Sequence, residues 1–396
     1  MTASAAYSIL PPLSDEERQH SAAAAALIRE RLEEAGGWLS FERFMELALY
    51  APGVGYYSAG SVKLGAGGDF VTAPELSDLF GRCIGRQCAQ VLRQSGGEIL
   101  EIGAGTGRMA AVVLQSLAEQ GVLPSRYAIL EVSADLAERQ RSRIERLPQE
   151  LRERVTWLDR LPSAPIVGCL LANEVLDALP TRRFVIRAGE LRELGVGLRD
   201  GAFAWAESPG APLDAGFAAL GTELMRTLPG VLPEGYTSEV CPHLEPWIGG
   251  VGACLERGML LLFDYGLPRR HYYHPQRLDG TLRCYFKQRA HDDPFINIAV
   301  QDITAWVDFT RVAEAAHAAG LEVSGFATQA AFLLGTGIEA LTAAAADEVG
   351  RARLAGEARR LLLPGEMGEA VKAMALTRHL PISLDGFVHQ DLRASL

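Results

Sequence analysis

The sequence predicts an α/β fold, built on a doubly wound, seven-stranded and mostly parallel sheet with an N-terminal helical cap and an antiparallel insertion. Three observations lead to this fold. From Glu98 onward, short apolar segments alternate with helical patterns, as expected where helices cover both faces of a parallel sheet. A glycine-rich turn at 103–107 follows the first of these strands. Between about 181 and 242, short strands separated by turn residues interrupt the alternation and indicate the insertion.

The N-terminal part, 1–95, is predicted to form the helical cap and a lid. Ser14 and Glu17 have the spacing of a capping box, so a helix begins there, and we expect it to end at the two glycines at 36–37. A second helix is expected after Ser40, because apolar residues recur on one helical face. The rest of this part is expected to contain, in order, a glycine- and tyrosine-rich loop at 51–68 and a helix at 75–94.

The central part, 96–330, is predicted to form the α/β domain, and 331–396 a helical C-terminal extension. A strongly apolar strand and then a polar, aromatic loop are expected after the insertion. The strands of the sheet are expected at 98–102, 126–132, 155–158, 166–172, 259–263 and 321–326. The helices between them are expected at 109–119, 134–146, 243–257 and 309–319. The insertion strands are expected at 184–186, 191–196 and 202–205, and the polar loop at 268–297.

Composition and charge argue against several classes of protein. The formal net charge of −11 disfavours broad nucleic-acid binding, which needs Lys and Arg to neutralise phosphates, and would suit a basic partner. No apolar run is long enough to span a membrane, so we expect no membrane insertion. The N-terminus shows neither a secretory signal nor an arginine-rich transit peptide, so we expect a cytoplasmic protein.

Neither the cysteines nor the histidines form a metal-binding pattern. The six cysteines contain no CxxC pair, so we expect buried, reduced thiols. His271 and His274 lack a third ligand at a convincing spacing, and the arginines around them make a solvated or substrate-facing loop the better interpretation. We therefore expect no metal site.

The glycine-rich turn predicts a nucleoside cofactor without a phosphate. Gly103, Gly105 and Gly107 have the spacing GxGxG, which differs from the GxGxxG of dinucleotide sites, and no GxxxxGK[ST] loop occurs. Glycines there let the backbone turn sharply and let a ligand approach closely. S-adenosylmethionine has an ammonium, a carboxylate, a sulfonium and a ribose but no phosphate, and Glu101 before the turn suits its ammonium. The alternative is a turn that only joins a strand to a helix.

Two more carboxylates follow neighbouring strands. Glu131 ends the second strand, where a carboxylate can accept hydrogen bonds from both ribose hydroxyls of an adenosine. Nicotinamide cofactors use the same contact, so Glu131 indicates a nucleoside but not which one. Asp159 follows the third strand, where its side chain could accept a hydrogen bond from the adenine amino group.

Polar residues at the end of the fourth strand are the candidates for the methyl acceptor site. Asn173, Glu174 and Asp177 lie where ligands bind in open α/β sheets, outside the carboxyl ends of the strands. Methyl transfer is an in-line displacement, so positioning of the acceptor is the main requirement. Asn173 could hold an acceptor amine or amide, and a carboxylate could grip and orient a guanidinium. The alternative is that Glu174 and Asp177 cap the following turn.

Three residues in loops complete the candidates. Tyr265 follows the buried fifth strand and could line the acceptor pocket, although a simple turn is an equal alternative. Asp69 could close over the cofactor as a lid carboxylate, and Thr72 is assigned to the same side of the cofactor. The alternative for this segment is a helix-capping loop, with Thr72 as the cap and Asp69 in solvent.

These motifs together resemble the MidA family of methyltransferases, a group that includes the mitochondrial arginine methyltransferase needed for complex I assembly. The resemblance covers about three quarters of the chain, roughly 40–340. It implies a Rossmann-like class I methyltransferase fold and family members implicated in methylating arginine of a partner protein. The most specific stretches are GDFVTAPE and NEVLDALP. The matching segments are 41–50, 55–57, 68–75, 101–107, 173–180, 264–266, 301–304 and 307–310.

The sequence therefore predicts an S-adenosylmethionine-dependent methyltransferase that modifies a nitrogen acceptor, with arginine of a protein substrate as the expected target. Glu174 is the first candidate for orienting the acceptor and Asp177 the second. A nicotinamide-dependent oxidoreductase, a small-molecule methyltransferase and a non-catalytic, cofactor-binding assembly factor remain alternatives. The oligomeric state stays open, with a homodimer among the options.

Overall fold

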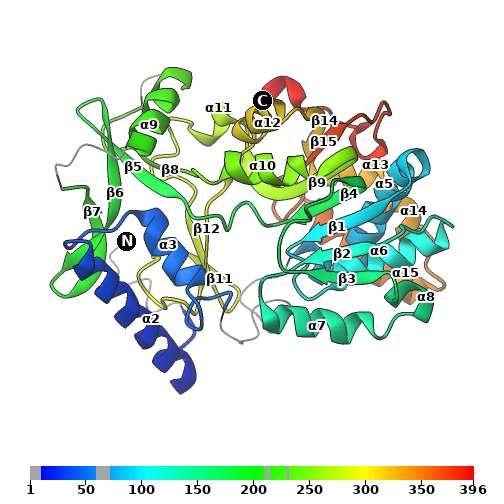
Figure 1. Cartoon of the computed structure of the whole chain (residues 1–396), viewed down its shortest axis with the longest axis horizontal. Helices are drawn as coiled ribbons and strands as arrows, with labels where there is room; N and C mark the ends of the chain where they lie inside the picture. The colour runs from blue at the N-terminus through cyan, green and yellow to red at the C-terminus, as the bar shows by residue number, and fades with distance from the viewer. Residues whose placement is uncertain (1–9, 59–71, 210–214, 229–231) are drawn as a thin grey trace.

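The fold is built around a strongly twisted central sheet (Figure 1). The computed structural model describes residues 10–58, 72–209, 215–228 and 232–396. Within them the strand order is β14-β15-β9-β4-β1-β2-β3, with a short eighth strand, β13, beside β9. The pairs β3–β2, β2–β1, β1–β4 and β4–β9 are parallel, whereas β15 runs antiparallel to both of its neighbours. The strands are β1 (Glu98–Ile102), β2 (Tyr127–Leu130), β3 (Val155–Leu158), β4 (Ile166–Asn173), β9 (Leu255–Leu267), β13 (Val307–Asp308), β14 (Glu322–Thr328) and β15 (Val371–Arg378).

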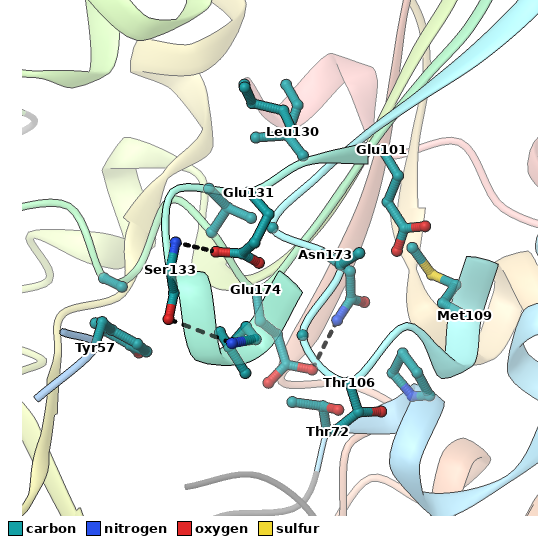
Figure 2. A pocket seen from close by; sticks show the side chains of 18 of the residues that line it. Tyr57, Thr72, Glu101, Thr106, Met109, Leu130, Glu131, Ser133, Asn173 and Glu174 are labelled. Carbon is teal, nitrogen blue, oxygen red and sulfur yellow. Dashed lines mark hydrogen bonds between the residues drawn. The ribbon is translucent and has the colours of Figure 1, made fainter. Parts of the chain in front are cut away.

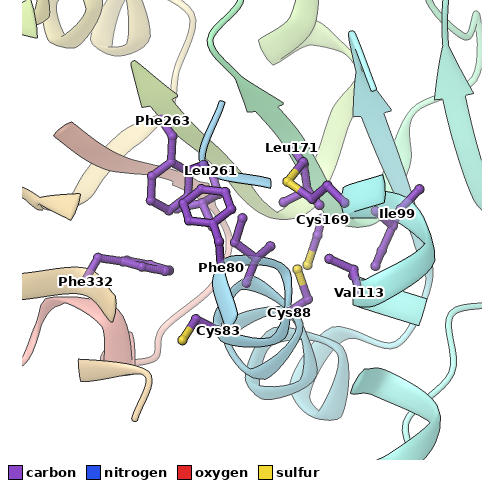
Figure 3. Packing of buried hydrophobic residues seen from close by; sticks show 14 of the residues in the cluster. Phe80, Cys83, Cys88, Ile99, Val113, Cys169, Leu171, Leu261, Phe263 and Phe332 are labelled. Atoms are coloured by element: carbon purple, nitrogen blue, oxygen red, sulfur yellow. The ribbon is translucent and has the colours of Figure 1, made fainter. Parts of the chain in front are cut away.

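Helices cover both faces of this sheet, as the alternation of patterns predicts. One apolar cluster lies between the sheet and the face formed by α5, α6, α13 and α15, and a second lies under α10 and α12. Figure 3 shows Phe80 of α5 between strand and helix residues of the first cluster, with its ring centroid 5.1 Å from that of Phe263. The helices are α5 (Asp78–Ser95), α6 (Arg108–Glu119), α7 (Ala134–Ile144), α8 (Gln149–Arg152), α10 (Leu244–Ala253), α12 (Phe309–Ala318), α13 (Gln329–Gly335), α14 (Ile338–Ala343) and α15 (Glu348–Leu362).

The insertion and the N-terminal helices form a second lobe, which lies on the left in Figure 1. α2 (Asp15–Glu34) begins at the expected capping box, and Ser40 caps α3 (Phe41–Tyr50). The aromatic side chains of α3 pack on those of β7, with the ring centroids of Phe41 and Trp205 4.9 Å apart. The insertion is an antiparallel sheet in the order β7-β6-β5-β8. It consists of β5 (Arg182–Arg187), β6 (Glu190–Arg199), β7 (Ala202–Glu207), α9 (Ala215–Thr227) and β8 (Thr237–Val240).

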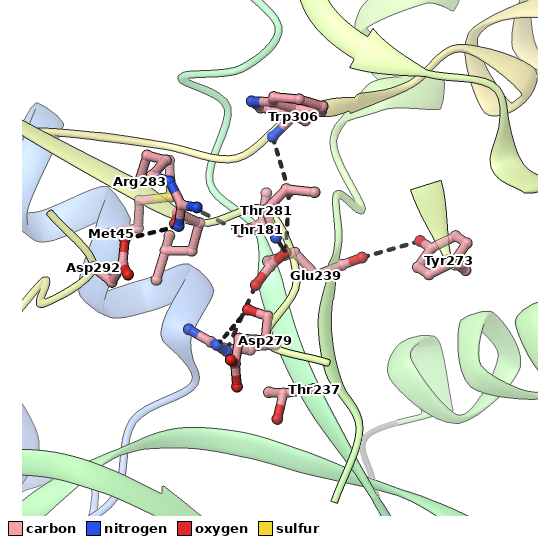
Figure 4. A network of polar contacts seen from close by, with 12 residues as sticks. Met45, Thr181, Thr237, Glu239, Tyr273, Asp279, Thr281, Arg283, Asp292 and Trp306 are labelled. Atoms are coloured by element: carbon pink, nitrogen blue, oxygen red, sulfur yellow. Dashed lines mark hydrogen bonds and ion pairs between the residues drawn. The ribbon is translucent and has the colours of Figure 1, made fainter. Parts of the chain in front are cut away.

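A buried polar network ties the insertion to the α/β domain (Figure 4). Glu239 of β8 is fully buried, and its carboxylate accepts hydrogen bonds from the backbone N–H and the hydroxyl of Thr281 at 2.8 and 3.1 Å. Arg183 of β5 lies 3.6 Å from the same carboxylate, and the Tyr273 hydroxyl donates to the Glu239 carbonyl. Because a buried charge is costly unless it is paired and hydrogen-bonded, this network fixes how the insertion meets the domain.

The segment expected as a polar loop contains a three-stranded sheet in the order β11-β10-β12. Lys287 and Gln288 make the β10–β11 turn with φ of 46° and 62°. Such turns usually carry Gly, Asn or Asp, so the usual sequence signal for a hairpin is absent here. The elements of the segment are α11 (Arg269–Tyr272), β10 (Arg283–Phe286), β11 (Arg289–His291) and β12 (Asp302–Thr304). The helix expected at 75–94 is likewise two helices, α4 (Ala73–Leu76) and α5, separated at Ser77.

The helical extension expected at 331–396 contains a strand that was not predicted. α13, α14 and α15 lie there, but Val371–Arg378 forms β15 in the interior of the sheet, between β9 and β14. Its alanine, methionine, leucine and lysine are helix-favouring residues, and the tertiary position overrides that preference. Two short 3-10 turns, η1 (Asp385–Phe387) and η2 (Arg393–Ser395), complete the tail.

We expect substitution of Met374 by alanine to destabilise the whole α/β domain. Met374 is fully buried on β15, so its loss leaves a cavity and should lower the free energy of unfolding by about 2–5 kcal/mol. Val388→Ala in the same tail is the control, because Val388 is 59% exposed and should change stability by less than about 0.5 kcal/mol. Denaturant unfolding measures both, and equal losses would contradict the central position of β15.

Candidate functional site

A pocket opens at the carboxyl ends of β1, β2 and β4, on the side that faces the second lobe (Figure 2). Most of its wall comes from the glycine-rich turn and the residues that follow β2 and β4. The remaining wall comes from α3, the turn after it, and the start of α4. The described lining residues are Tyr50, Tyr57, Thr72, Pro74, Glu75, Glu101, Ile102, Gly103, Ala104, Gly105, Thr106, Met109, Leu130, Glu131, Val132, Ser133, Leu136, Asn173, Glu174, Val175 and Ala178.

The glycine-rich turn has the backbone that its composition predicts. Gly103, Gly105 and Gly107 have φ of 69°, 53° and 77°, in the left-handed region that favours glycine. A Cβ on Gly103 would lie 3.2 Å from the Val175 side chain, closer than an ordinary contact, so a larger residue would crowd the turn after β4. Gly107 differs from the other two, since it does not line the pocket and instead caps α6 against Gln140.

Glu101 lies at the base of the pocket, where its side chain is only 1% exposed. The Tyr127 hydroxyl donates a hydrogen bond of 2.5 Å to one carboxylate oxygen. Burial raises the pKa of Glu101 to about 7, against the opposing effect of the Tyr127 hydrogen bond and with a further increase from the charge of Glu131. A cation beside Glu101 would lower this pKa again, because it favours the ionised form.

Glu131 is held rigidly at the rim. One carboxylate oxygen accepts from the Ser133 backbone N–H at 2.8 Å, and the other accepts from the Gln140 side chain at 2.9 Å. Gln140 also donates to the Gly105 carbonyl at 2.9 Å and accepts from the Trp157 indole at 3.0 Å. The glutamine thus connects the rim carboxylate with the glycine-rich turn. Gln140 was not predicted, because a glutamine inside a polar helix carries no distinctive sequence pattern.

Three further residues, Asp159, Thr72 and Asp69, were expected to contact the cofactor. Asp159 does not line the pocket: its side chain is 87% exposed beside Arg160, because β3 ends at the previous residue and the chain turns into solvent. Thr72 lines the pocket and precedes α4, but its side chain makes no capping hydrogen bond. Asp69 lies outside the described residues. Val132 was not predicted, and it is an apolar side chain at the pocket that is 83% exposed.

Glu174 and Asn173 lie in the middle of the lining residues in Figure 2. The Asn173 amide donates to the Glu174 carboxylate at 3.1 Å, while the Asn173 side-chain oxygen is buried with no hydrogen-bond partner among the described residues. Glu174 has φ of 51°, an unfavourable conformation for a residue with a side chain. Burial, followed by the charge of Asp264, raises the pKa of Glu174 to about 8.

Behind Glu174 lies a cluster of further carboxyl groups. Asp177 is buried and does not line the pocket, and burial together with Asp264 and Glu174 raises its pKa well above the ordinary value. Asp264 of β9 and Asp302 of β12 join it, and both are almost fully buried. The Asp177 and Glu174 carboxyls therefore experience mainly the charges of other carboxyls, which leaves this region able to stabilise a cation.

Two tyrosines form the wall of the pocket that lies opposite these carboxyl groups. The rings of Tyr50 and Tyr57 stack with centroids 5.5 Å apart, and both line the pocket. The Tyr57 hydroxyl donates to Asp302 at 2.9 Å, and the Tyr50 hydroxyl donates to the Ala178 carbonyl at 2.8 Å. Tyr265, the tyrosine expected here, is half-buried near Glu174 but does not line the pocket. Tyr50 and Tyr57 were not predicted as site residues, because only the fold brings the second lobe close to the sheet.

Comparison with known proteins identifies the family. A family described as "Putative S-adenosyl-L-methionine-dependent methyltransferase" matches residues 83–327, more than half of the chain. The chain belongs to this family. A Burkholderia thailandensis protein whose structure was solved with bound S-adenosyl-homocysteine is 40% identical, with a TM-score of 0.91 over 98% of this chain and 100% of that chain. The Rossmann-like class I fold, the methyltransferase activity and S-adenosylmethionine as the cofactor are thus confirmed.

Curated relatives are similar over most of the chain. The Drosophila melanogaster relative, named "Protein arginine methyltransferase NDUFAF7 homolog, mitochondrial", is 28% identical over 78% of this chain and 74% of its own length. The Mus musculus relative, "Protein arginine methyltransferase NDUFAF7, mitochondrial", is 27% identical over 87% of this chain and 82% of its own length.

None of the described helices is long and apolar enough to cross a membrane. The homodimer stays a prediction.

The expected cytoplasmic location is contradicted, because these relatives are named as mitochondrial proteins. That expectation rested on the missing features of a secretory signal and of a transit peptide. Such signals are weak patterns of composition, so their absence from the first residues does not determine a compartment.

We expect Glu174→Gly to stabilise the protein while it removes activity. Glycine relieves a left-handed conformation that costs about 1–3 kcal/mol, and it loses roughly 0.5–1 kcal/mol more backbone entropy on folding. The expected net gain in the free energy of unfolding is about 1 kcal/mol, measured by denaturant titration, and methyl transfer should fall to background. Ala188→Gly is the matched control: Ala188 also has φ of 51° but lies in an exposed turn, so it should gain stability and keep activity. If Glu174→Gly lost stability while Ala188→Gly gained it, the result would contradict backbone strain at Glu174.

Proposed function

We propose that this methyltransferase transfers a methyl group to a guanidinium nitrogen of arginine in a partner protein. The observation that carries the proposal is a cluster of carboxyl groups beside the cofactor pocket: Glu174 lines the pocket, and the buried Asp177, Asp264 and Asp302 lie behind it, opposite two stacked tyrosines. Carboxylates bind a guanidinium by paired, charge-assisted hydrogen bonds, and aromatic faces favour a planar cation. The printed names of the curated relatives, protein arginine methyltransferases, support the same acceptor.

The lining of the pocket suits S-adenosylmethionine, which supplies a methyl group on a positive sulfur when it is bound. We propose that Glu101 binds the ammonium end and that Glu131 accepts hydrogen bonds from the ribose hydroxyls. The bare backbone of Gly103 and Gly105 permits close approach of the ligand. Val132 supports this assignment, because an apolar side chain that is 83% exposed would be covered by a flat, apolar ring.

Asn173 and Glu174 would orient the acceptor. The unpartnered oxygen of Asn173 can accept a hydrogen bond from a guanidinium N–H, and such a contact would remove the cost of a buried, unsatisfied acceptor. A carboxyl whose pKa is raised to about 8 by burial is also suited to accept the proton that the acceptor nitrogen loses. Asp177 and Tyr265 do not line the pocket, so we propose that they act through the charge and shape of the site rather than by contact.

Isotopic methyl transfer tests the proposed acceptor. We expect labelled S-adenosylmethionine to mark arginine in proteins from cells that lack this enzyme, as shown by mass spectrometry of the modified residues. Glu174→Gln keeps the size of the side chain but cannot accept the proton, so turnover should fall by about 10²–10⁴-fold. Affinity for S-adenosylhomocysteine should change by less than threefold, which serves as the control for folding. Label confined to small metabolites or to lysine, or full activity of Glu174→Gln, would contradict the proposal.

A titration of cofactor affinity against pH tests the proposed contact of Glu101. The ammonium needs an ionised partner, and a carboxyl with a pKa of about 7 is mostly protonated at pH 6 and mostly ionised at pH 8. We therefore expect S-adenosylhomocysteine to bind about tenfold more tightly at pH 8 than at pH 6, measured by calorimetry. Glu101→Gln should bind weakly at both pH values. Glu98→Gln is the control on the same strand, because Glu98 pairs with Arg126 outside the pocket. Equal pH dependence in wild type and Glu101→Gln would contradict the contact.

A further inference from the structure

We propose that Asp264 is the positioning residue of the acceptor site, because its carboxylate holds the turn after β4 in the shape that directs Glu174 into the pocket. The side chain does not line the pocket and is 1% exposed, so it reaches neither solvent nor a ligand there. Its effect on turnover rests on the proposed function of Glu174, whereas its effect on the turn does not.

The contacts of Asp264 converge from consecutive residues. One carboxylate oxygen accepts from the backbone N–H groups of Val175, Leu176 and Asp177, at 3.2, 2.8 and 3.3 Å. The other oxygen accepts from the backbone N–H of Tyr265 at 2.8 Å. Successive backbone N–H groups in a turn form a concave site for an anion, and here the anion is a side chain of the neighbouring strand.

The topology explains why this turn needs such a partner. β4 and β9 pair in parallel up to Asn173 and Phe263, and the Glu174 N–H donates to the Phe263 carbonyl at 2.8 Å. β4 then ends while β9 continues to residue 267, so the next three amides of the turn have no strand to pair with. Buried amides without acceptors are costly, and Asp264, the next residue of β9, supplies the acceptor.

The same turn contains the left-handed Glu174. A non-glycine residue keeps this conformation only where its surroundings impose it. The turn is fixed on one side by the Phe263 carbonyl and on the other by the carboxylate of Asp264, so the backbone on both sides of Glu174 is bonded to β9. We infer that these bonds together set the direction of the Glu174 side chain.

Asparagine cannot replace this carboxylate, although it has nearly the same shape. All four contacts of Asp264 are with N–H donors, which occupy both carboxylate oxygens. An asparagine could place its oxygen on one side only, and its NH₂ group would then face a backbone N–H on the other side, donor against donor. Asp264→Asn is therefore a small change with a specific expected defect.

Hydrogen exchange and kinetics of Asp264→Asn test the proposal. We expect the amides of 175–177 to exchange at least about tenfold faster while β1 keeps its protection, because opening is local. Affinity for S-adenosylhomocysteine should stay within threefold and the KM for S-adenosylmethionine should change little, while kcat for methyl transfer into total cell protein falls at least 100-fold. Unchanged exchange at 175–177 would overturn the proposal. Faster exchange with unchanged kcat would overturn only the effect on turnover, and would also count against the role of Glu174.

Asp308→Asn is the matched control. Asp308 is also a buried aspartate that accepts two backbone N–H groups, those of Thr310 and Arg311, but it does so at the start of α12, outside the pocket. We expect this variant to lose stability without faster exchange at 175–177. Equal acceleration at 175–177 in both variants would show a general loss of structure and would overturn the proposal.

A double-mutant cycle covers the case in which Asp264→Asn folds poorly. If the carboxylate holds Glu174 in its left-handed conformation, the drop in Tm caused by Asp264→Asn should be smaller in a Glu174→Gly background, where that strain is absent. If Asp264→Asn alone does not fold but the double variant with Glu174→Gly does, that result would also support the coupling. An equal or larger drop in Tm in the Glu174→Gly background would overturn it.

Discussion

Burial of carboxyl groups beside the cofactor pocket is the constraint on which the rest of the site depends. Each carboxylate that leaves water loses hydration worth several kcal/mol, unless hydrogen bonds or a counter-charge replace it. Asp264 is satisfied by four backbone N–H groups and Asp302 by a tyrosine hydroxyl among its contacts. Glu174 accepts from Asn173, yet burial still raises its pKa to about 8. Of the four carboxyl groups, Glu174 alone lines the pocket within the described residues, so it is the one that a cation bound there would contact.

The sequence predicted those parts of the site that depend on local chain geometry. A strand followed by GxGxG favours a sharp turn with an open backbone, and Glu101, Gly103 and Gly105 do line the pocket. The missing parts depend on contacts between distant segments. Tyr57 reaches the pocket from the N-terminal lobe, and Asp264 reaches the β4 turn across the sheet. Neither contact leaves a periodic pattern in the sequence.

The errors in the fold have the same origin. β15 consists of helix-favouring residues and becomes a strand only because β9 and β14 present open edges on its two sides. The β10–β11 hairpin turns at Lys287 and Gln288, which are not typical hairpin residues, so only the surrounding structure imposes their positive φ. Asp159 was placed correctly after its strand, but the sequence pattern does not determine on which side of the chain the side chain lies. Local preference decides an element where tertiary contacts are weak, whereas at β15 and at the β10–β11 hairpin tertiary contacts are decisive.

The two lobes supply different walls of the pocket, and we assign cofactor binding to one and the acceptor wall to the other. The sheet and its turns supply Glu101 and Glu131 and would hold the cofactor, which many methyltransferases share. The second lobe supplies Tyr50 and Tyr57, and the Tyr50 hydroxyl donates to the Ala178 carbonyl, directly after the turn that carries Glu174. A change in the position of the lobe would therefore act on the acceptor wall and on that turn together. Because a buried network around Glu239 fixes the insertion to the domain, we propose that the position of the second lobe helps to shape the acceptor side of the pocket.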